Sequence, residues 1–226
     1  MPTLFVICGL PFSGKTYLSK KLAEKLAIKR ISYDDLWKEI NQKESRDPSW
    51  EELCSIVESQ IADELKAGRS VIYDTLNDTV GNREKLRKVA QGSNGEAIVV
   101  YADTPLDLIH SRRKENITSR DRHDVLEINF QEALNKFEVP NSTQVVYKLT
   151  PEQEINAWLD DFGCFVESHS REFREKLTEM IEGHATDWWK PKEFEENIRP
   201  ILPKSLEIIS PPPQYEQNYN CFVFAF

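Results

Sequence analysis

An eight-residue stretch near the N-terminus constrains this chain more than any other part of it. The stretch runs from Gly9 to Thr16 and fits the pattern G-x-x-x-x-G-K-[ST]. An apolar run at residues 4–8 precedes it, and residues 15–26 have the spacing of an amphipathic helix. Strand, glycine-bounded loop and helix in this order predict a phosphate-binding loop, or P-loop. The alternative is a glycine turn followed by Lys-Thr by chance, and the flanking strand and helix argue against it.

The residue types of this loop match the chemistry of a nucleoside triphosphate. Successive backbone N–H groups at a helix N-terminus can surround a polyphosphate. Gly9 and Gly14 permit the tight turn and the close approach of the backbone. We expect the Lys15 ammonium to reach the β- and γ-phosphates and the Thr16 hydroxyl to bind Mg²⁺. The sequence therefore predicts ATP and Mg²⁺ as ligands, without separating ATP from GTP.

Beyond the loop, short apolar runs alternate with helical patterns. We expect strands at 4–8, 29–32, 70–73, 97–101 and 144–147, and helices at 15–26, 50–66, 82–91, 105–116 and 126–137. This alternation predicts an α/β fold, a P-loop NTPase with a parallel sheet of about five strands covered by helices on both faces. We place this domain at residues 1–150. Residues 151–226 are expected to form a mainly helical, proline-rich C-terminal extension, with Gly163 as a possible break.

Two aspartates follow expected strands. Asp34 comes after the second strand and Asp74 after the third. Because ligands of parallel sheets bind beyond the carboxyl ends of the strands, both should lie on the rim that carries the P-loop. We expect Asp34 to take the proton from an attacking hydroxyl, and Asp74 to hold the Mg²⁺ shell or to orient the acceptor. Each could instead cap a helix, and Asp35 is more cap-like than Asp34.

Five cations lie within eleven residues after the fourth expected strand, at Arg112, Arg113, Lys114, Arg120 and Arg122. A transferring phosphoryl group needs cationic clamps, which a mobile lid can bring over the phosphates. We predict such a lid near residues 112–125; the alternative is a solvated helix face. The expected catalytic residues are Lys15, Asp34, Asp74 and Arg120, and the expected metal ligands are Thr16 and Asp74. The expected nucleotide-binding residues are Gly9, Pro11, Ser13, Gly14, Lys15, Thr16, Tyr17, Arg112 and Asn116.

Charge is unevenly distributed along the chain. Residues 151–226 hold 15 acidic and 7 basic side chains, whereas residues 1–150 hold 23 and 22. A nearly neutral domain with an acidic extension argues against broad, sequence-independent binding of nucleic acid. The aromatic residues of the extension favour packing on the core, and a surface for a protein partner is the alternative.

The composition also bears on the compartment. No apolar run approaches the roughly 20 residues needed to span a bilayer, so we expect no membrane partner. The first residues lack the basic start of a signal peptide. Four widely spaced cysteines, Cys8, Cys54, Cys164 and Cys221, form no C-x-x-C pair. This usage favours reduced thiols and a cytoplasmic location.

Together, these motifs resemble the P-loop kinase group that includes polynucleotide 5′-kinases, zeta-toxin-like kinases and predicted bacterial AAA-type kinases. The matching segments are residues 7–16, 33–35, 71–77 with Arg83 following, 116–120, 122–125 and 136–140. The resemblance covers about residues 3–160. It implies Asp34 as general base, Asp74 as an acceptor-side or Mg²⁺-linked acid, and Arg120 as a lid arginine. Residues 74–77 are also similar to tRNA-modification ATPases of the Elongator-linked type.

Two positions depart from the pattern of that group. Residues 36–38 lack the arginine that binds the acceptor's phosphate in polynucleotide kinases, and Ile117 stands where relatives often carry a lid arginine. The sequence therefore predicts an ATP-dependent phosphotransferase whose acceptor is a small molecule or a nucleic-acid end. Trp37 and the tryptophans of the extension could form a stacking wall for that acceptor. A tRNA-linked P-loop ATPase and a nucleotide-dependent regulatory module remain as alternatives.

Overall fold

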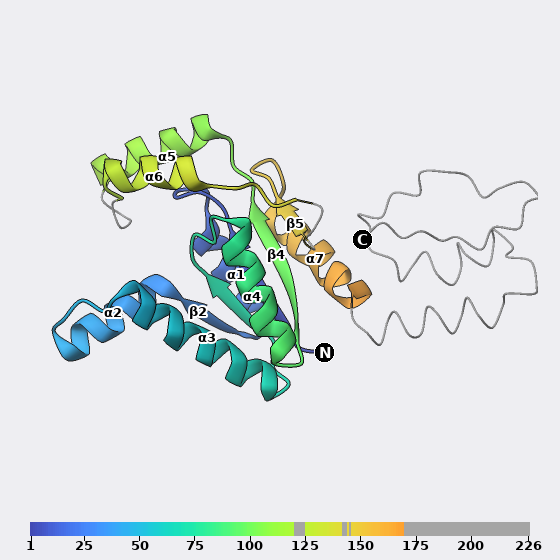
Figure 1. Cartoon of the computed structure of the whole chain (residues 1–226). Helices are drawn as coiled ribbons and strands as arrows, with labels where there is room; N and C mark the ends of the chain where they lie inside the picture. The colour runs from blue at the N-terminus through green and yellow to red at the C-terminus, as the bar shows by residue number, and fades with distance from the viewer. Residues whose placement is uncertain (120–124, 142–143, 145, 170–226) are drawn as a thin grey trace, which may run out of the picture. The chain divides into compact units, whose positions relative to one another are not determined.

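The structure is a computed structural model that describes residues 1–119, 125–141, 144 and 146–169 (Figure 1). The chain divides into two units, Met1–Glu154 and Ile155–Phe226. Within the second unit the structure describes helix α7, Ile155–His169. Within the described ranges, no helix has both the length and the apolar character needed to cross a membrane.

A five-stranded parallel sheet in the order β2-β3-β1-β4-β5 forms the centre of the first unit. The strands are β1 Thr3–Cys8, β2 Lys29–Ser32, β3 Val71–Asp74, β4 Glu96–Ala102 and β5 Val146–Leu149. All six residues of the central strand β1 are buried, as expected for a parallel strand that is covered on both faces. The predicted α/β fold is confirmed.

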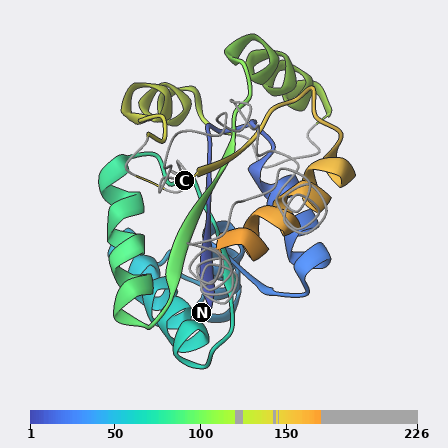
Figure 2. The same cartoon turned by 90° about the vertical axis from the view of Figure 1, so that its right-hand side faces the viewer.

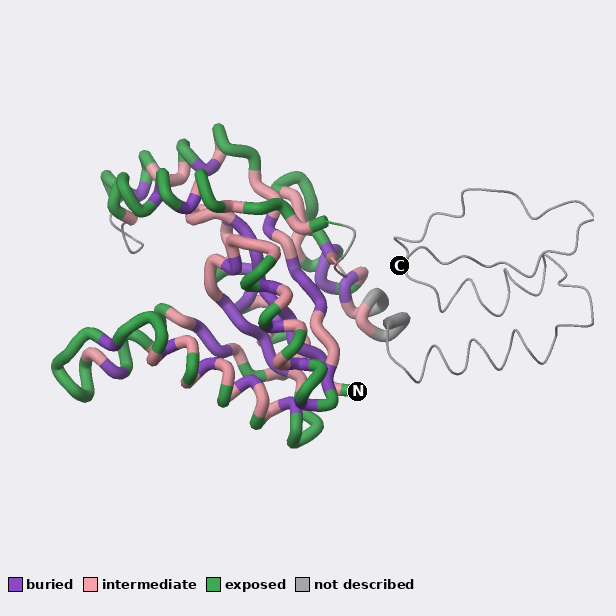
Figure 3. Tube along the Cα trace, viewed as in Figure 1, coloured by how far each residue is buried: buried purple, intermediate pink, exposed green. Residues whose placement is uncertain are grey.

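The helices of the first unit that the structure describes are α1 Lys15–Leu26, α2 Tyr33–Glu44, α3 Trp50–Lys66, α4 Val80–Gly92, α5 Leu106–Ser119 and α6 Glu127–Lys136. Of these, α1, α3 and α4 cover the two faces of the sheet. Helix α1 lies on one face, and α3 and α4 lie together on the other (Figure 2). On the second face, Val57, Ile61 and Leu65 of α3 pack with Leu4 and Val6 of β1. Figure 3 shows the resulting buried layer along the strands and the exposed outer sides of the helices.

Capping residues determine where two of the helices begin. The Ser32 hydroxyl accepts the backbone N–H of Asp35 at the start of α2, and the Ser49 hydroxyl accepts that of Glu52 at the start of α3. Each cap satisfies an N–H group that the first helical turn leaves open. Because Ser32 ends β2, its cap places Asp34 in the first turn of α2, at the carboxyl edge of the sheet.

Three sequence-based boundaries were wrong. The polar composition of residues 41–48 predicts a loop, but helix α2 continues to Glu44, because polar residues can extend a helix through pairs such as Lys43–Glu39. Strand β5 begins at Val146, two residues later than expected, where it pairs with Val99 of β4. Helix α7 continues through Gly163, because one glycine costs a helix only about 1 kcal/mol.

Candidate active site

The loop between β1 and α1 forms an open polar cradle. Gly9 has φ +150° and Gly14 has φ +101°, values that L side chains rarely adopt. A Cβ atom at Gly9 would lie 2.7 Å from the Ser13 hydroxyl oxygen and 2.9 Å from the carbonyl oxygen of Ala102. The Ser13 hydroxyl is buried and has no hydrogen-bond partner among the described residues. This orphaned polar group and the glycine-lined space fit a polyphosphate.

We expect Gly9→Ala to destabilise the protein and to abolish nucleotide binding. The new methyl group would clash with a backbone oxygen and impose a strained φ, at a combined cost of about 2–5 kcal/mol. Urea unfolding followed by circular dichroism measures this loss. Gly92→Ala is the matched control, because its new Cβ would meet no atom within 4 Å. An unchanged unfolding midpoint in Gly9→Ala would contradict the close packing of the loop.

Lys15 is the cationic side chain of the P-loop. Its Nζ atom donates a hydrogen bond to the carbonyl oxygen of Leu10 at 2.7 Å. Burial lowers the pKa of Lys15 to about 8, and the negative charges of Asp74 and Asp34 act in the opposite direction. Both aspartates are therefore within electrostatic range of the ammonium group. The ammonium is positioned to bind a phosphate once it is released from the carbonyl.

This lowered pKa predicts a pH-dependent affinity for nucleotide. In the free protein Lys15 loses its proton above about pH 8, whereas bound phosphates favour the charged form and raise its pKa. Binding at about pH 9 should therefore take up nearly one proton, and affinity should fall up to about tenfold per pH unit above 8. By the same linkage, stability of the free protein should rise between about pH 8 and 10.5, because the unfolded chain holds this proton more tightly.

Calorimetric titration of a non-hydrolysable ATP analogue checks the proton uptake. The titration is run at pH 7 and pH 9, in two buffers of different ionisation enthalpy. The same heat in both buffers at pH 9 would show that Lys15 keeps an ordinary pKa.

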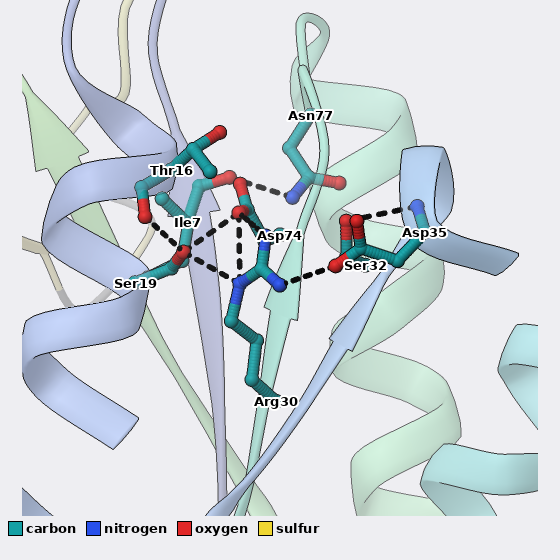
Figure 4. Close-up of polar contacts among 8 residues, drawn as sticks. All are labelled: Ile7, Thr16, Ser19, Arg30, Ser32, Asp35, Asp74 and Asn77. Carbon is teal, nitrogen blue, oxygen red and sulfur yellow. Dashed lines mark hydrogen bonds and ion pairs between the residues drawn. The ribbon is translucent and has the colours of Figure 1, made fainter. Parts of the chain in front are cut away.

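Asp74 lies in a buried ion pair below the P-loop (Figure 4). Its Oδ2 atom accepts hydrogen bonds from Arg30 Nη2 at 2.6 Å, Arg30 Nε at 3.1 Å and the Ser19 hydroxyl at 2.6 Å. The Ser19 oxygen is also 3.1 Å from the carbonyl oxygen of Thr16. The network therefore joins the end of β3, which carries Asp74, to the first turn of α1, which carries Thr16. These are the two predicted metal ligands.

Arg30 is a site residue that the sequence analysis missed. It also pairs through Nη1 with Asp35 Oδ2 at 2.6 Å, so one guanidinium holds two of the three aspartates at this edge (Figure 4). Asp34 is exposed, and no hydrogen bond or ion pair within the described part of the chain engages its carboxylate. The sequence signal that could have identified Arg30 is its place in strand β2, which is next to the strand that ends in Asp74. Asp34 is thus the aspartate with an available carboxylate.

The donor set fits Mg²⁺ held mainly by phosphates. Thr16 and Tyr17 are exposed at the start of α1, and Pro11 is half-buried in the loop. The hydrogen bonds that Asp74 accepts from Arg30 and Ser19 all go to Oδ2, so Thr16 and Asp74 are two candidate ligands. Among the described residues no three His, Cys, Asp or Glu side chains could hold a metal together. Few protein ligands is the usual pattern for Mg²⁺ on a nucleotide.

Helix α5 carries one predicted arginine onto the P-loop. Arg112 Nη1 donates to the carbonyl oxygens of Phe12 and Ser13 at 3.2 and 3.1 Å. Thr104, just before α5, donates through its hydroxyl to the same Ser13 carbonyl at 2.9 Å. Asn116 lies one turn beyond Arg112 and is buried. The base of the predicted lid is therefore joined directly to the phosphate-binding loop.

The other predicted lid cations have different positions. Arg113 pairs with Glu127 and stacks 4.6 Å from the ring centre of Phe130, so it joins α5 to α6. The Phe130 ring also contacts Phe12 of the P-loop, with 6.3 Å between ring centres. Phe130 was missed, because a single buried phenylalanine gives no functional signal. Arg120 and its neighbours at 121–124 lie outside the described residues.

A buried arginine, Arg83, joins four segments around the start of the P-loop. Arg83 of α4 is 1% exposed. It donates to the carbonyl oxygens of Asn77 and Glu138 at 2.7 and 2.8 Å and to Gln144 Oε1 at 3.2 Å. Its Nη1 is 3.5 Å from Cys8 Sγ. Burial raises the pKa of the Cys8 thiol to about 11, although the charge of Arg83 opposes this shift. Cys8 is therefore a neutral packing group.

A cavity of about 670 Å³ opens beside the carboxyl end of β3. Tyr33 and Trp50 form its aromatic wall, with 4.8 Å between ring centres. Trp37 was suggested as part of such a wall, but it does not line the cavity. The tryptophans at 188 and 189 lie outside the described residues. The lining residues are Tyr33, Trp50, Cys54, Val57, Glu58, Tyr73, Thr75, Leu76, Asn77, Asp78, Asn82, Lys85, Leu86, Asn129, Glu132, Ala133 and Lys136.

Three features define a P-loop nucleotide-binding protein with a kinase-type fold. They are the strand order of the sheet, the glycine-bounded loop, and the aspartates at the carboxyl edge of the sheet. Residues 4–140 match the model of the AAA domain family, and the chain belongs to that family. A curated relative is the protein KTI12 homolog of Arabidopsis thaliana, which is 27% identical over 164 residues. The match covers 67% of this chain and 54% of the relative, so the chain spans about half the length of that protein.

Solved structures show the same fold. A sugar kinase from Janibacter sp. superposes with a TM-score of 0.56 at 17% identity, over 74% of this chain and 95% of that chain. Kti12 of Chaetomium thermophilum, solved in complex with ADP-AlF3, gives a TM-score of 0.56 at 20% identity, over 70% and 96% of the two chains. At these identities the likeness establishes the fold. Together with the family match, these structures confirm the predicted P-loop kinase-type fold.

Proposed function

We propose that this protein is an Mg²⁺- and ATP-dependent phosphotransferase of the cytoplasm. The observation that carries the proposal is the difference between the aspartates at the edge of the sheet. Arg30 holds Asp35 and Asp74, whereas Asp34 is exposed, lies within electrostatic range of Lys15 and has no partner among the described residues. An available carboxylate next to the phosphate-binding lysine is the arrangement that a general base requires.

Each residue then has a distinct task in the transfer. The loop amides and Lys15 bind the β- and γ-phosphates and stabilise the charge on the transferring group. Arg112, already on the loop, adds a second cation at its rim, and Asn116 and Arg120 belong to the proposed lid. Asp34 takes the proton of the acceptor hydroxyl. Bound Mg²⁺, held through Thr16 and Asp74, would neutralise charge on the phosphate oxygens.

One alternative has an observation of its own. The identity of 27% to the KTI12 homolog, together with the motif at residues 74–77, favours a tRNA-linked ATPase. In that case water replaces the acceptor, and the bound nucleotide controls binding of a partner. The acidic C-terminal extension would then be the surface for a protein partner.

The fate of the γ-phosphate separates the two functions. The full chain is incubated with γ-labelled ATP and Mg²⁺, with a metabolite extract, with total tRNA or with neither. Label on an organic acceptor supports the phosphotransferase. Free phosphate whose release rises several-fold with tRNA, without a labelled acceptor, would contradict the phosphotransferase and support the ATPase. Lys15→Ala provides the background for both measurements.

A further inference from the structure

The cavity beside β3 has a wall suited to a flat ring. Trp50 is 53% exposed, so one face of its indole is open, while Tyr33 supports the ring from its other side. Tyr73, which is 4% exposed, forms the floor on the sheet. Stacking of a base on an aromatic side chain contributes about 1–3 kcal/mol. A volume of about 670 Å³ also lies within the usual range for small ligands.

The charges of the cavity disfavour a phosphate group. Both lining lysines are already paired, Lys85 with Glu58 at 2.5 Å and Lys136 with Glu132 at 2.5 Å. Asp78 adds a further carboxylate to the lining, so two cations face three anions. A phosphate is bound well by unpaired cations or by a helix N-terminus. A phosphorylated acceptor would instead have to displace a carboxylate and would bring two more negative charges.

Neutral polar groups complete the lining. Asn82 Nδ2 donates to Asp78 Oδ1 at 2.8 Å, which orients that amide. Asn129 is exposed on α6, and its side chain has no hydrogen-bond partner within the described residues. Carboxamides both donate and accept hydrogen bonds, so they suit the edge of an uncharged heterocycle.

The cavity is next to the residues of the proposed chemistry. Tyr33 directly precedes Asp34, and the lining residues 75–78 directly follow Asp74. Asn77 Nδ2 donates to the carbonyl oxygen of Ile7 at 2.7 Å, which fixes the rim of the cavity to the strand that enters the P-loop. The cavity therefore lies beside the carboxyl edge of the sheet that carries Asp34, which is not itself a lining residue, and the hydroxyl group of a bound ligand would extend from the cavity toward this edge.

We propose that the cavity binds an unphosphorylated nucleoside as the phosphoryl acceptor. The binding part rests on the cavity alone, and the transfer part rests on the proposed function. In the transfer, a bond forms between the nucleoside oxygen and the γ-phosphorus while the bond from that phosphorus to the β–γ bridging oxygen breaks. The hydroxyl proton passes to Asp34, and ADP leaves.

Calorimetry on the full chain tests the binding. Mg²⁺ and a non-hydrolysable ATP analogue first fill the P-loop, and then adenosine, guanosine, cytidine, uridine and their 5′-monophosphates are titrated. At least one nucleoside should bind, and its monophosphate should bind about tenfold or more weakly. Trp50→Leu should weaken the nucleoside about 5- to 150-fold, the equivalent of one stacked base. Trp37→Leu, a half-exposed tryptophan outside the cavity, should leave the affinity unchanged.

A second variant tests the charge argument. Glu58→Gln releases Lys85, so it should reduce the preference for nucleoside over monophosphate several-fold. Glu39→Gln is the matched control, because Glu39 forms the same kind of pair with Lys43 on α2. Absence of binding by all four nucleosides at millimolar concentration would overturn the proposal. So would a monophosphate, or a short oligonucleotide, that binds as tightly as the nucleoside.

Labelled ATP then separates failure of this inference from failure of the proposed function. Nucleoside binding without transfer of label would contradict the phosphotransferase and leave the binding part intact. Transfer to an acceptor that nucleosides do not compete with would overturn the inference and leave the phosphotransferase intact.

Discussion

Replacing Lys15 by alanine is expected to remove nucleotide turnover without unfolding the protein. The ammonium is the cation of the P-loop itself, and loss of such a clamp lowers phosphoryl transfer by about 10³-fold or more. Among the described residues its side chain bonds only to the carbonyl oxygen of Leu10, and it is not part of the buried core. Its lowered pKa shows that the folded protein disfavours the charge. The melting temperature should therefore stay the same or rise slightly below pH 8.

Turnover of labelled ATP and thermal unfolding measure the two effects separately. Lys20→Ala is the control, because Lys20 is an exposed lysine of the same helix. Turnover at the wild-type rate in Lys15→Ala would show that the loop does not act as a phosphate-binding loop. A large fall in melting temperature would assign Lys15 a structural role.

Asp34→Asn is expected to lower phosphoryl transfer by about 10²–10⁴-fold, the usual contribution of a general base. ATP affinity should stay within a few-fold of wild type, because the amide has the same size and the carboxylate forms no bond within the described structure. Single-turnover transfer and calorimetric ATP binding provide the two readouts. Both are measured with the acceptor that the labelling experiment identifies.

Asp35→Asn gives the matched comparison one residue along the chain. Asp35 pairs with Arg30 and its side chain is 60% exposed, so its loss should cost stability about 0–1 kcal/mol and have little effect on transfer. Full activity in Asp34→Asn would leave Asp34 as a helix-capping residue. A defect in ATP affinity alone would place its carboxylate at the metal.

The parts of the site that are local in sequence could be predicted from it. The loop from Gly9 to Thr16 is contiguous, and its chemistry follows from residue types and spacing. Asp34 and Asp74 could be placed on one edge because both follow strands of a parallel sheet. The sheet itself was predictable from the alternation of apolar runs and helical patterns.

The residues that were missed depend on distant partners. Arg30 was read as part of a strand, yet it selects which aspartates are held. Trp50 was read as the start of a helix, yet it forms the ring-binding wall that Trp37 was expected to provide. Arg113 was grouped with the lid cations, yet it fixes α5 to α6. In each case the role of the residue depends on contacts with segments that are distant in the sequence. A local sequence pattern does not predict such contacts.

The position of Arg83 has a consequence for the electric field inside the protein. None of the ion pairs within the described residues includes this arginine, and the groups it contacts are neutral carbonyl, amide and thiol groups. An unneutralised cation therefore lies under the strand that enters the P-loop. Mobile ions screen the field of this buried charge much less than they screen the field of a surface charge. It contributes a fixed positive potential at the loop before any ligand arrives. Folding thereby prepares part of the attraction for a polyphosphate, and that part should persist at ionic strengths that weaken surface arginines.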